Sequence, residues 1–73
     1  MTTPTNHIPV RLNGEDREFP RDTTVLGMVQ ERGLDRGGVA VEINRTIVPR
    51  STFEERALAP NDEIEIVTVL GGG

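Results

Sequence analysis

The dipeptide Asn13-Gly14 is the strongest local constraint on how this chain can fold. Both residues tolerate the positive φ angles of a type I′ turn, which joins two antiparallel strands through a two-residue loop. Residues 7–12 before it alternate between polar and apolar side chains, and the apolar face carries Ile8, Val10 and Leu12. The pattern therefore predicts a β-hairpin whose second strand covers residues 15–19. Pro9 indicates a strand start or a sheet edge, because proline cannot donate a ladder hydrogen bond.

A short helix is expected after the hairpin. Asp22-Thr23-Thr24 offers an N-cap, and Gly33 is suited to end the helix at C′. The apolar residues at helical spacing between them are Val25, Leu26, Met28 and Val29. Gly27 costs a helix about 1 kcal/mol relative to Ala, which indicates either close packing or a weak helix.

The second half of the chain predicts three further strands. Residues 39–43 alternate, with Val39, Val41 and Ile43 facing inward. Asn44-Arg45 turns the chain into a short strand over residues 46–48, which Pro49 ends. Residues 50–58 are too polar for more than about one turn of helix, with Phe53 and Leu58 as anchors, and residues 59–62 form a turn. The last strand covers residues 63–70 and is rich in β-branched side chains.

This order of elements predicts an α+β domain. If the last strand pairs in parallel with the first, it becomes central in the sheet, which is the arrangement of the ubiquitin-like β-grasp fold. We expect a mixed four- to five-stranded sheet packed on one main helix. The expected organisation is a disordered N-terminal extension over residues 1–6, a β-grasp domain over 7–70 and a flexible glycine tail over 71–73.

Composition excludes several classes of function. The net charge is −4, which argues against nucleic acid as a partner and favours a basic protein surface. The chain has no cysteine, so a disulfide framework and a thiolate zinc site are excluded. No apolar run reaches the length that spans a membrane, and a cytoplasmic protein is expected.

No group of residues predicts an enzyme. The single histidine, His7, and the carboxylates Glu15, Asp16 and Glu18 are interpreted as solvated side chains. The segment 35–38 contains two glycines but lacks the spacing of a phosphate-binding loop. We find no nucleophile with a base, no metal-ligand set and no cofactor loop.

The last strand runs directly into Gly71, Gly72 and Gly73. These glycines fit either a frayed or artificial tail, or a flexible carboxylate offered to a partner. If Ile64 and Ile66 face the core, the opposite face changes from acidic to apolar along the strand. Its residues are Glu63, Glu65, Val67 and Val69. We hypothesise that Val67, Val69 and Leu70 form a docking patch with an acidic rim, the alternative being that the chain itself covers this face.

Three segments carry a resemblance to a known family. They are residues 39–50, which contain the block Ile-Asn-x-x-Ile-Val-Pro-Arg, then residues 61–67, and then the terminal glycines. Together they resemble the thiamin-pathway sulfur carrier family, ThiS, from about Ile8 to Gly73. The N-terminal extension and the third glycine depart from the family pattern.

The resemblance implies a protein cosubstrate that is not itself an enzyme. An E1-like, ThiF-like adenylating enzyme would use ATP to activate the carboxylate of Gly73, and a sulfur donor enzyme would help convert it to a thiocarboxylate. Thiazole synthase, ThiG-like, would take the sulfur to build the thiazole of thiamin. Gly71 and Gly72 would serve tail recognition. The carrier itself would be a monomer on its own, with no bound cofactor, no metal, no nucleic acid and no membrane.

Two other functions remain open at this point. One is a sulfur carrier for molybdopterin, cysteine or tRNA thiolation, which would share the fold and the glycine end. The other is a ubiquitin-like binding or conjugating module without sulfur chemistry, which would give isopeptide-linked partners and no thiocarboxylate.

Overall fold

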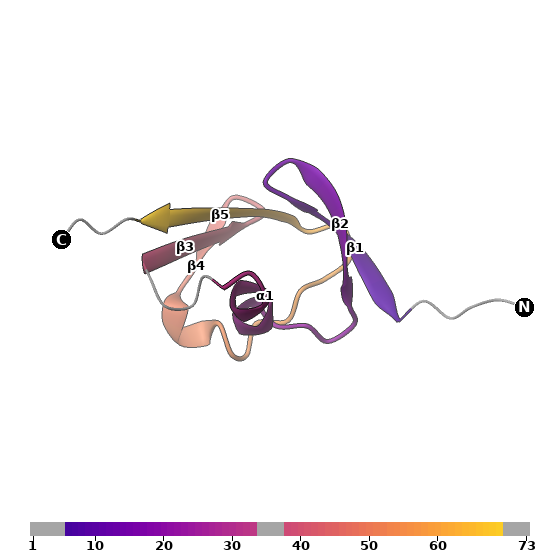
Figure 1. Cartoon of the computed structure of the whole chain (residues 1–73), viewed down its shortest axis with the longest axis horizontal. Coiled ribbons are helices and arrows are strands. Elements are labelled where there is room, and N and C mark those ends of the chain that lie inside the picture. Colours follow the sequence, from indigo (N-terminus) through magenta and orange to yellow (C-terminus); the bar gives the residue numbers. More distant parts are fainter. Residues whose placement is uncertain (1–5, 34–37, 70–73) are drawn as a thin grey trace, which may run out of the picture.

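The computed structural model describes residues 6–33 and 38–69, which form a five-stranded mixed sheet with one α-helix across it (Figure 1). The elements are β1 (His7–Leu12), β2 (Glu15–Pro20), α1 (Val25–Glu31), β3 (Gly38–Ile43), β4 (Thr46–Val48), the 3₁₀ helix η1 (Arg50–Thr52) and β5 (Glu63–Val69). The expectations for residues 1–5, 34–37 and 70–73 lie outside the described residues.

The β1–β2 hairpin forms as predicted. Asn13 and Gly14 have φ angles of 51° and 83°, as a type I′ turn requires. β2 reaches Pro20, one residue further than expected, because Pro20 pairs with His7. Beyond this pair, the backbone N–H of Arg21 donates to the carbonyl oxygen of Asn6 at 2.6 Å.

The position of Pro9 differs from the expectation of a strand start or sheet edge. Pro9 lies inside β1, and β1 is an interior strand in the order β2-β1-β5-β3-β4. It is tolerated there because β5 pairs with β1 only at Arg11 and Leu12. At Pro9 that side of β1 carries no ladder, and the Pro9 carbonyl accepts from the N–H of Asn61 at 2.6 Å instead.

β5 is the central strand, as the sequence predicted. It runs parallel to β1 on one side and antiparallel to β3 on the other, where the register pairs Ile43 with Ile64 and Val39 with Thr68. β3 begins at Gly38, one residue earlier than expected, because Gly38 pairs with Val69. The last described strand therefore lies in the middle of the sheet.

α1 depends on the loop that follows β4. The Thr24 hydroxyl caps the helix by accepting from the N–H of Gly27 at 3.1 Å. The N–H groups of Val25 and Leu26 donate to the carbonyls of Arg56 and Phe53, at 2.8 and 2.9 Å. These bonds satisfy the donors that every helix N-terminus leaves free, so a seven-residue helix is supported by its surroundings.

The two glycines predicted to matter for α1 behave differently. Gly33 has a φ of 70° and follows the C-cap residue Arg32, as expected of a C′ glycine. Gly27 is not closely packed, because a Cβ built there meets its nearest atoms, on Thr24 and Thr23, at 3.6 and 3.8 Å. Of the two interpretations from the sequence, close packing is therefore wrong.

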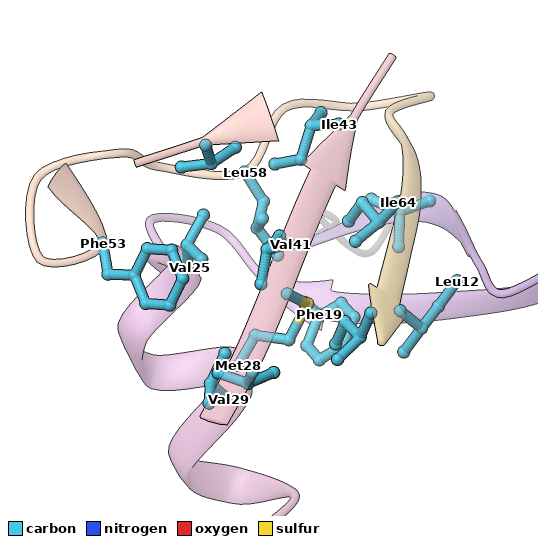
Figure 2. Packing of buried hydrophobic residues seen from close by; sticks show 14 of the residues in the cluster. Leu12, Phe19, Val25, Met28, Val29, Val41, Ile43, Phe53, Leu58 and Ile64 are labelled. Carbon is cyan, nitrogen blue, oxygen red and sulfur yellow. The ribbon is translucent and has the colours of Figure 1, made fainter. Parts of the chain in front are cut away.

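The core fills the space between α1 and the facing side of the sheet (Figure 2). Every inward residue predicted from the alternating patterns is buried in it. The fully buried side chains are Val25, Met28, Val29, Val41 and Ile64. Phe53 and Leu58, the anchors expected in the loop after β4, close the core beside the start of the helix. The opposite side of the sheet carries no helix among the described residues.

Candidate functional site

A buried carboxylate holds the base of β5. Asp62 is only 5% exposed, and its Oδ1 accepts from Nδ2 of Asn44 at 3.0 Å while its Oδ2 accepts from the N–H of Ala59 at 2.8 Å. Oδ1 of Asn44 accepts from the N–H of Glu63 at 3.0 Å. These side-chain bonds therefore fasten the β3–β4 turn to the start of β5, in addition to the backbone bond from the N–H of Asn44 to the carbonyl of Glu63 at 2.8 Å.

Asn13 holds β5 from the other side. Its backbone N–H donates to the carbonyl of Ile64 at 2.8 Å, and its side-chain Oδ1 accepts from the N–H of Ile66 at 2.8 Å. The side chain thus takes the place of the next backbone acceptor of β1, at the point where the hairpin turns away. Together, Asn13, Asn44 and Asp62 fix the strand that leads to the glycine tail.

The side of the sheet opposite α1, which we call the outer face, carries the predicted docking residues that the structure describes. Val67 is 58% exposed and lies opposite Ala40 of β3. No described residue covers it, so the alternative that the chain buries this position is not supported within residues 6–33 and 38–69. Glu63 and Glu65 precede it on the same face and are exposed. The predicted change from acidic to apolar along β5 is confirmed as far as Val67.

Ile47 of β4 is a second exposed apolar residue of the outer face, and it was not predicted as part of the docking surface. It is 62% exposed and pairs with Glu42, which itself lies opposite Glu65. The sequence placed Ile47 in a strand but did not give the register of β4 on β3, so its position on the outer face, across β3 from β5, could not be derived. The available signal was the alternation that places Val48 inward and Ile47 outward.

The outer face is acidic next to its apolar residues. A shallow depression on it is lined by Glu42, Arg45, Glu63 and Glu65. The ion pair found within the described parts of the chain, Arg17 with Glu15, lies elsewhere, on the exposed hairpin. Glu42, Glu63 and Glu65 have no ion-pair partner among the described residues, and Arg45 is the one basic side chain that lines the depression with them. This arrangement suits a partner with basic side chains.

The remaining predicted site residues are placed only in part. Val69 is the last residue of β5 and pairs with Gly38. Leu70, Gly71, Gly72 and Gly73 lie outside the described residues. The structure thus places the strand that precedes the tail, while the docking role of Val69 and Leu70 and the tail roles remain predictions.

The described residues offer no assembled catalytic group. His7 begins β1 and Ser51 lies in η1, and no hydrogen bond joins their side chains. Within 6–33 and 38–69, no three acidic or histidine side chains come together in a way that could hold a metal ion. The same residues contain no helix of the length and apolar character needed to cross a membrane.

A mixed sheet ordered β2-β1-β5-β3-β4, with one helix across one face and a central last strand, defines the β-grasp class. A solved structure of this fold, the thiamine biosynthesis protein ThiS from Geobacter metallireducens, superimposes with a TM-score of 0.75 at 20% identity, covering 90% of this chain and all of that one. The chain belongs to the ThiS family, whose model matches residues 10–73.

Two curated relatives agree with this family. The sulfur carrier protein ThiS of Bacillus subtilis is 35% identical over 65 residues, covering 88% of this chain and 98% of the relative. A thiazole synthase from Paramagnetospirillum magneticum is 44% identical over 62 residues, covering 85% of this chain. The chain spans only 19% of the length of that thiazole synthase.

Proposed function

We propose that this chain is a sulfur carrier protein of thiamin biosynthesis and acts as a protein cosubstrate. The observation that carries the proposal is membership of the ThiS family across residues 10–73, a match that includes the three glycines. The relative from Bacillus subtilis, which is matched over nearly its whole length, is itself named a sulfur carrier protein.

The reacting group is the carboxylate of Gly73. A carboxylate is a poor electrophile, so one of its oxygens first attacks the α-phosphorus of ATP and pyrophosphate leaves. Hydrosulfide (HS⁻) from the sulfur donor then attacks the carbonyl carbon of the acyl-adenylate, a carbon–sulfur bond replaces the bond to the phosphate oxygen, and AMP leaves, which yields the thiocarboxylate. An E1-like partner supplies the nucleotide site and the positive charge for these steps.

The described residues support a presenting role for the domain in this chemistry. β5 is central in the sheet and is held by Asn13, Asn44 and Asp62, so the chain is anchored up to the residues just before the tail. Glycines at 71–73 carry no side chain, which suits entry into a narrow site on a partner. The domain holds the tail, and the partner performs the reaction.

Thiazole synthase is the proposed acceptor of the sulfur. In the Paramagnetospirillum magneticum relative, a segment similar to this chain is part of a protein named thiazole synthase. The proposed contacts to the partners are Val67, Val69 and Leu70. Ile47 is a further exposed apolar residue of the outer face, and the outer-face carboxylates Glu42 and Glu65 lie between it and β5 or on β5 itself.

Intact-mass measurement tests the carrier function. We expect the chain to exchange one oxygen for one sulfur when it is incubated with its adenylating enzyme, ATP and a sulfur donor. Removal of Gly73 alone should abolish the exchange while the domain stays folded, because β5 ends before that residue. An unchanged mass with the cognate adenylating enzyme would contradict the proposal.

A further inference from the structure

One edge of β5 is paired over only part of its length. β1 pairs with β5 at Arg11 and Leu12, and the chain then turns back at Asn13 and Gly14. β5 continues past Ile64, the partner of Leu12, as far as Val69. Figure 1 shows this last part of β5 running beyond the β1–β2 hairpin toward the C-terminus, with β3 along its other side.

The hydrogen bonds identify which backbone groups this leaves open. The N–H of Asn44 donates to the carbonyl of Glu63 at 2.8 Å, so the odd-numbered residues of β5 bond to β3. The even-numbered residues face the hairpin, where Asn13 bonds to the carbonyl of Ile64 and the N–H of Ile66. By the same alternation, the carbonyl of Ile66 and both backbone groups of Thr68 face this side, and no described residue bonds to them. We call these three groups the open edge.

The open edge has the features of a docking position for another strand. Unpaired strand edges are templates for pairing with a second chain, and an alternating acceptor, donor and acceptor fits an extended backbone. Thr68 is exposed, so the position is accessible. The edge also lies directly before the residues that carry the tail, so a strand paired there would set the direction in which the tail leaves the domain.

We propose that an extended segment of thiazole synthase pairs with the open edge at Ile66 and Thr68 and adds a strand to the sheet. This proposal rests on the carrier function proposed above. Backbone hydrogen bonds supply the attachment, and side chains of the added strand supply specificity. Glu65 is exposed on the outer face beside this edge, so the added strand is expected to carry Arg or Lys.

Amide hydrogen exchange, followed by NMR of the full ¹⁵N-labelled chain, tests the pairing at single residues. Without partner, the N–H of Thr68 is expected to exchange fast, whereas the N–H of Val67, paired with Ala40, is already protected. With saturating thiazole synthase from the same organism, exchange at Thr68 should slow by about tenfold or more, the effect of one hydrogen bond that water no longer replaces. Unchanged exchange at Thr68 in the complex, or no binding at all, would overturn the proposal.

A pair of variants tests whether the edge contributes to affinity. Thr68→Pro removes the outward N–H and fills the edge with the proline ring, while the odd-numbered bonds to β3 stay intact. Thr68→Val is the matched control, because it keeps the N–H and the β-branched shape and removes only the hydroxyl. With both variants shown folded by their amide spectra, we expect Thr68→Pro to bind thiazole synthase at least about tenfold more weakly, and Thr68→Val to bind like the native chain. Equal affinities of the two variants would overturn the proposal.

Other outcomes distinguish this proposal from self-association of the chain and from the carrier function itself. Protection of Thr68 that grows with the concentration of the chain alone would mean that the edge pairs with a second copy, and would overturn the assignment to thiazole synthase. The carrier function is judged separately, by thiocarboxylate formation on the native chain. A native chain that gains sulfur but binds thiazole synthase without protecting Thr68 would therefore refute the edge pairing and leave the carrier function standing.

Discussion

At the scale of single residues, the structure depends on side chains that form hydrogen bonds in place of backbone groups. Asn13 continues the ladder of β1 for one more bond, and Asn44 satisfies the first N–H of β5. Asp62 is buried beside Asn44, and both of its side-chain oxygens accept hydrogen bonds. Because buried polar groups cost free energy only when they are unpaired, this network stabilises the base of β5.

Asp62→Asn is expected to lower the free energy of unfolding by about 1–3 kcal/mol, although it preserves the side-chain shape. One carboxylate oxygen becomes an NH₂ group, which must then face either Nδ2 of Asn44 or the N–H of Ala59, both of which are donors. Rotating the Asn44 amide gives no relief, because its oxygen is needed by the N–H of Glu63. Chemical denaturation measures the change.

Asp16→Asn is the matched control for this substitution. Asp16 is exposed on β2, so the same chemical change should alter stability by no more than about 0.5 kcal/mol. Equal stability of Asp62→Asn and Asp16→Asn would show that the network does not stabilise the strand.

At the scale of elements, most of the fold could be predicted from the sequence because its signals are local. The Asn13-Gly14 turn, the Thr24 cap and the alternating strands are each determined by a few adjacent residues, and each is confirmed. The network around Asp62 could not be predicted, because it joins residues that are 18 positions apart. Ile47 was missed for a related reason, since its place on the outer face depends on the register between β3 and β4.

The helix α1 carries a substitution that should make the domain more stable. Gly27→Ala is expected to raise the free energy of unfolding by about 1 kcal/mol, because alanine loses less backbone entropy in a helix. The new Cβ would lie 3.6 Å from Oγ1 of Thr24, which is ordinary van der Waals contact, and the capping N–H is kept. Thermal or urea denaturation measures the gain.

Gly14→Ala provides the contrast at a second glycine. A Cβ at Gly14 meets no atom within 4 Å, but its φ of 83° strains any L-residue. We therefore expect a loss of about 1 kcal/mol there. A gain in stability from Gly14→Ala, or a loss from Gly27→Ala, would contradict this account, which assigns a backbone-entropy cost to Gly27 and a required turn geometry to Gly14.

At the scale of the whole molecule, the two faces of the sheet have separate roles. One face packs on α1 and forms the core (Figure 1). The outer face offers exposed apolar side chains and carboxylates. β5 contributes side chains to both faces, because Ile64 and Ile66 are buried in the core while Val67 is exposed on the outer face. A stable small domain can thus present a strand end and a docking surface at one place.

Val67→Asp tests the docking surface without disturbing the core. Because Val67 is 58% exposed, the variant should remain folded, but a carboxylate buried against a partner should lower kcat/KM for adenylation by about tenfold or more. Val67→Thr, which keeps the β-branched shape, should retain most of the activity. A folded Val67→Asp with native turnover would exclude this position from the interface.

The central claim is that the chain carries sulfur for thiazole formation, and it is tested most directly by following the sulfur itself. The chain is loaded with radioactive sulfur as the thiocarboxylate, purified, and mixed with thiazole synthase and its other substrates. We predict that the label leaves the chain and appears in the thiazole product, with unlabelled carboxylate regenerated on Gly73. Label that stays on the chain, or that moves only to acceptors of molybdopterin, cysteine or tRNA thiolation, would contradict the account.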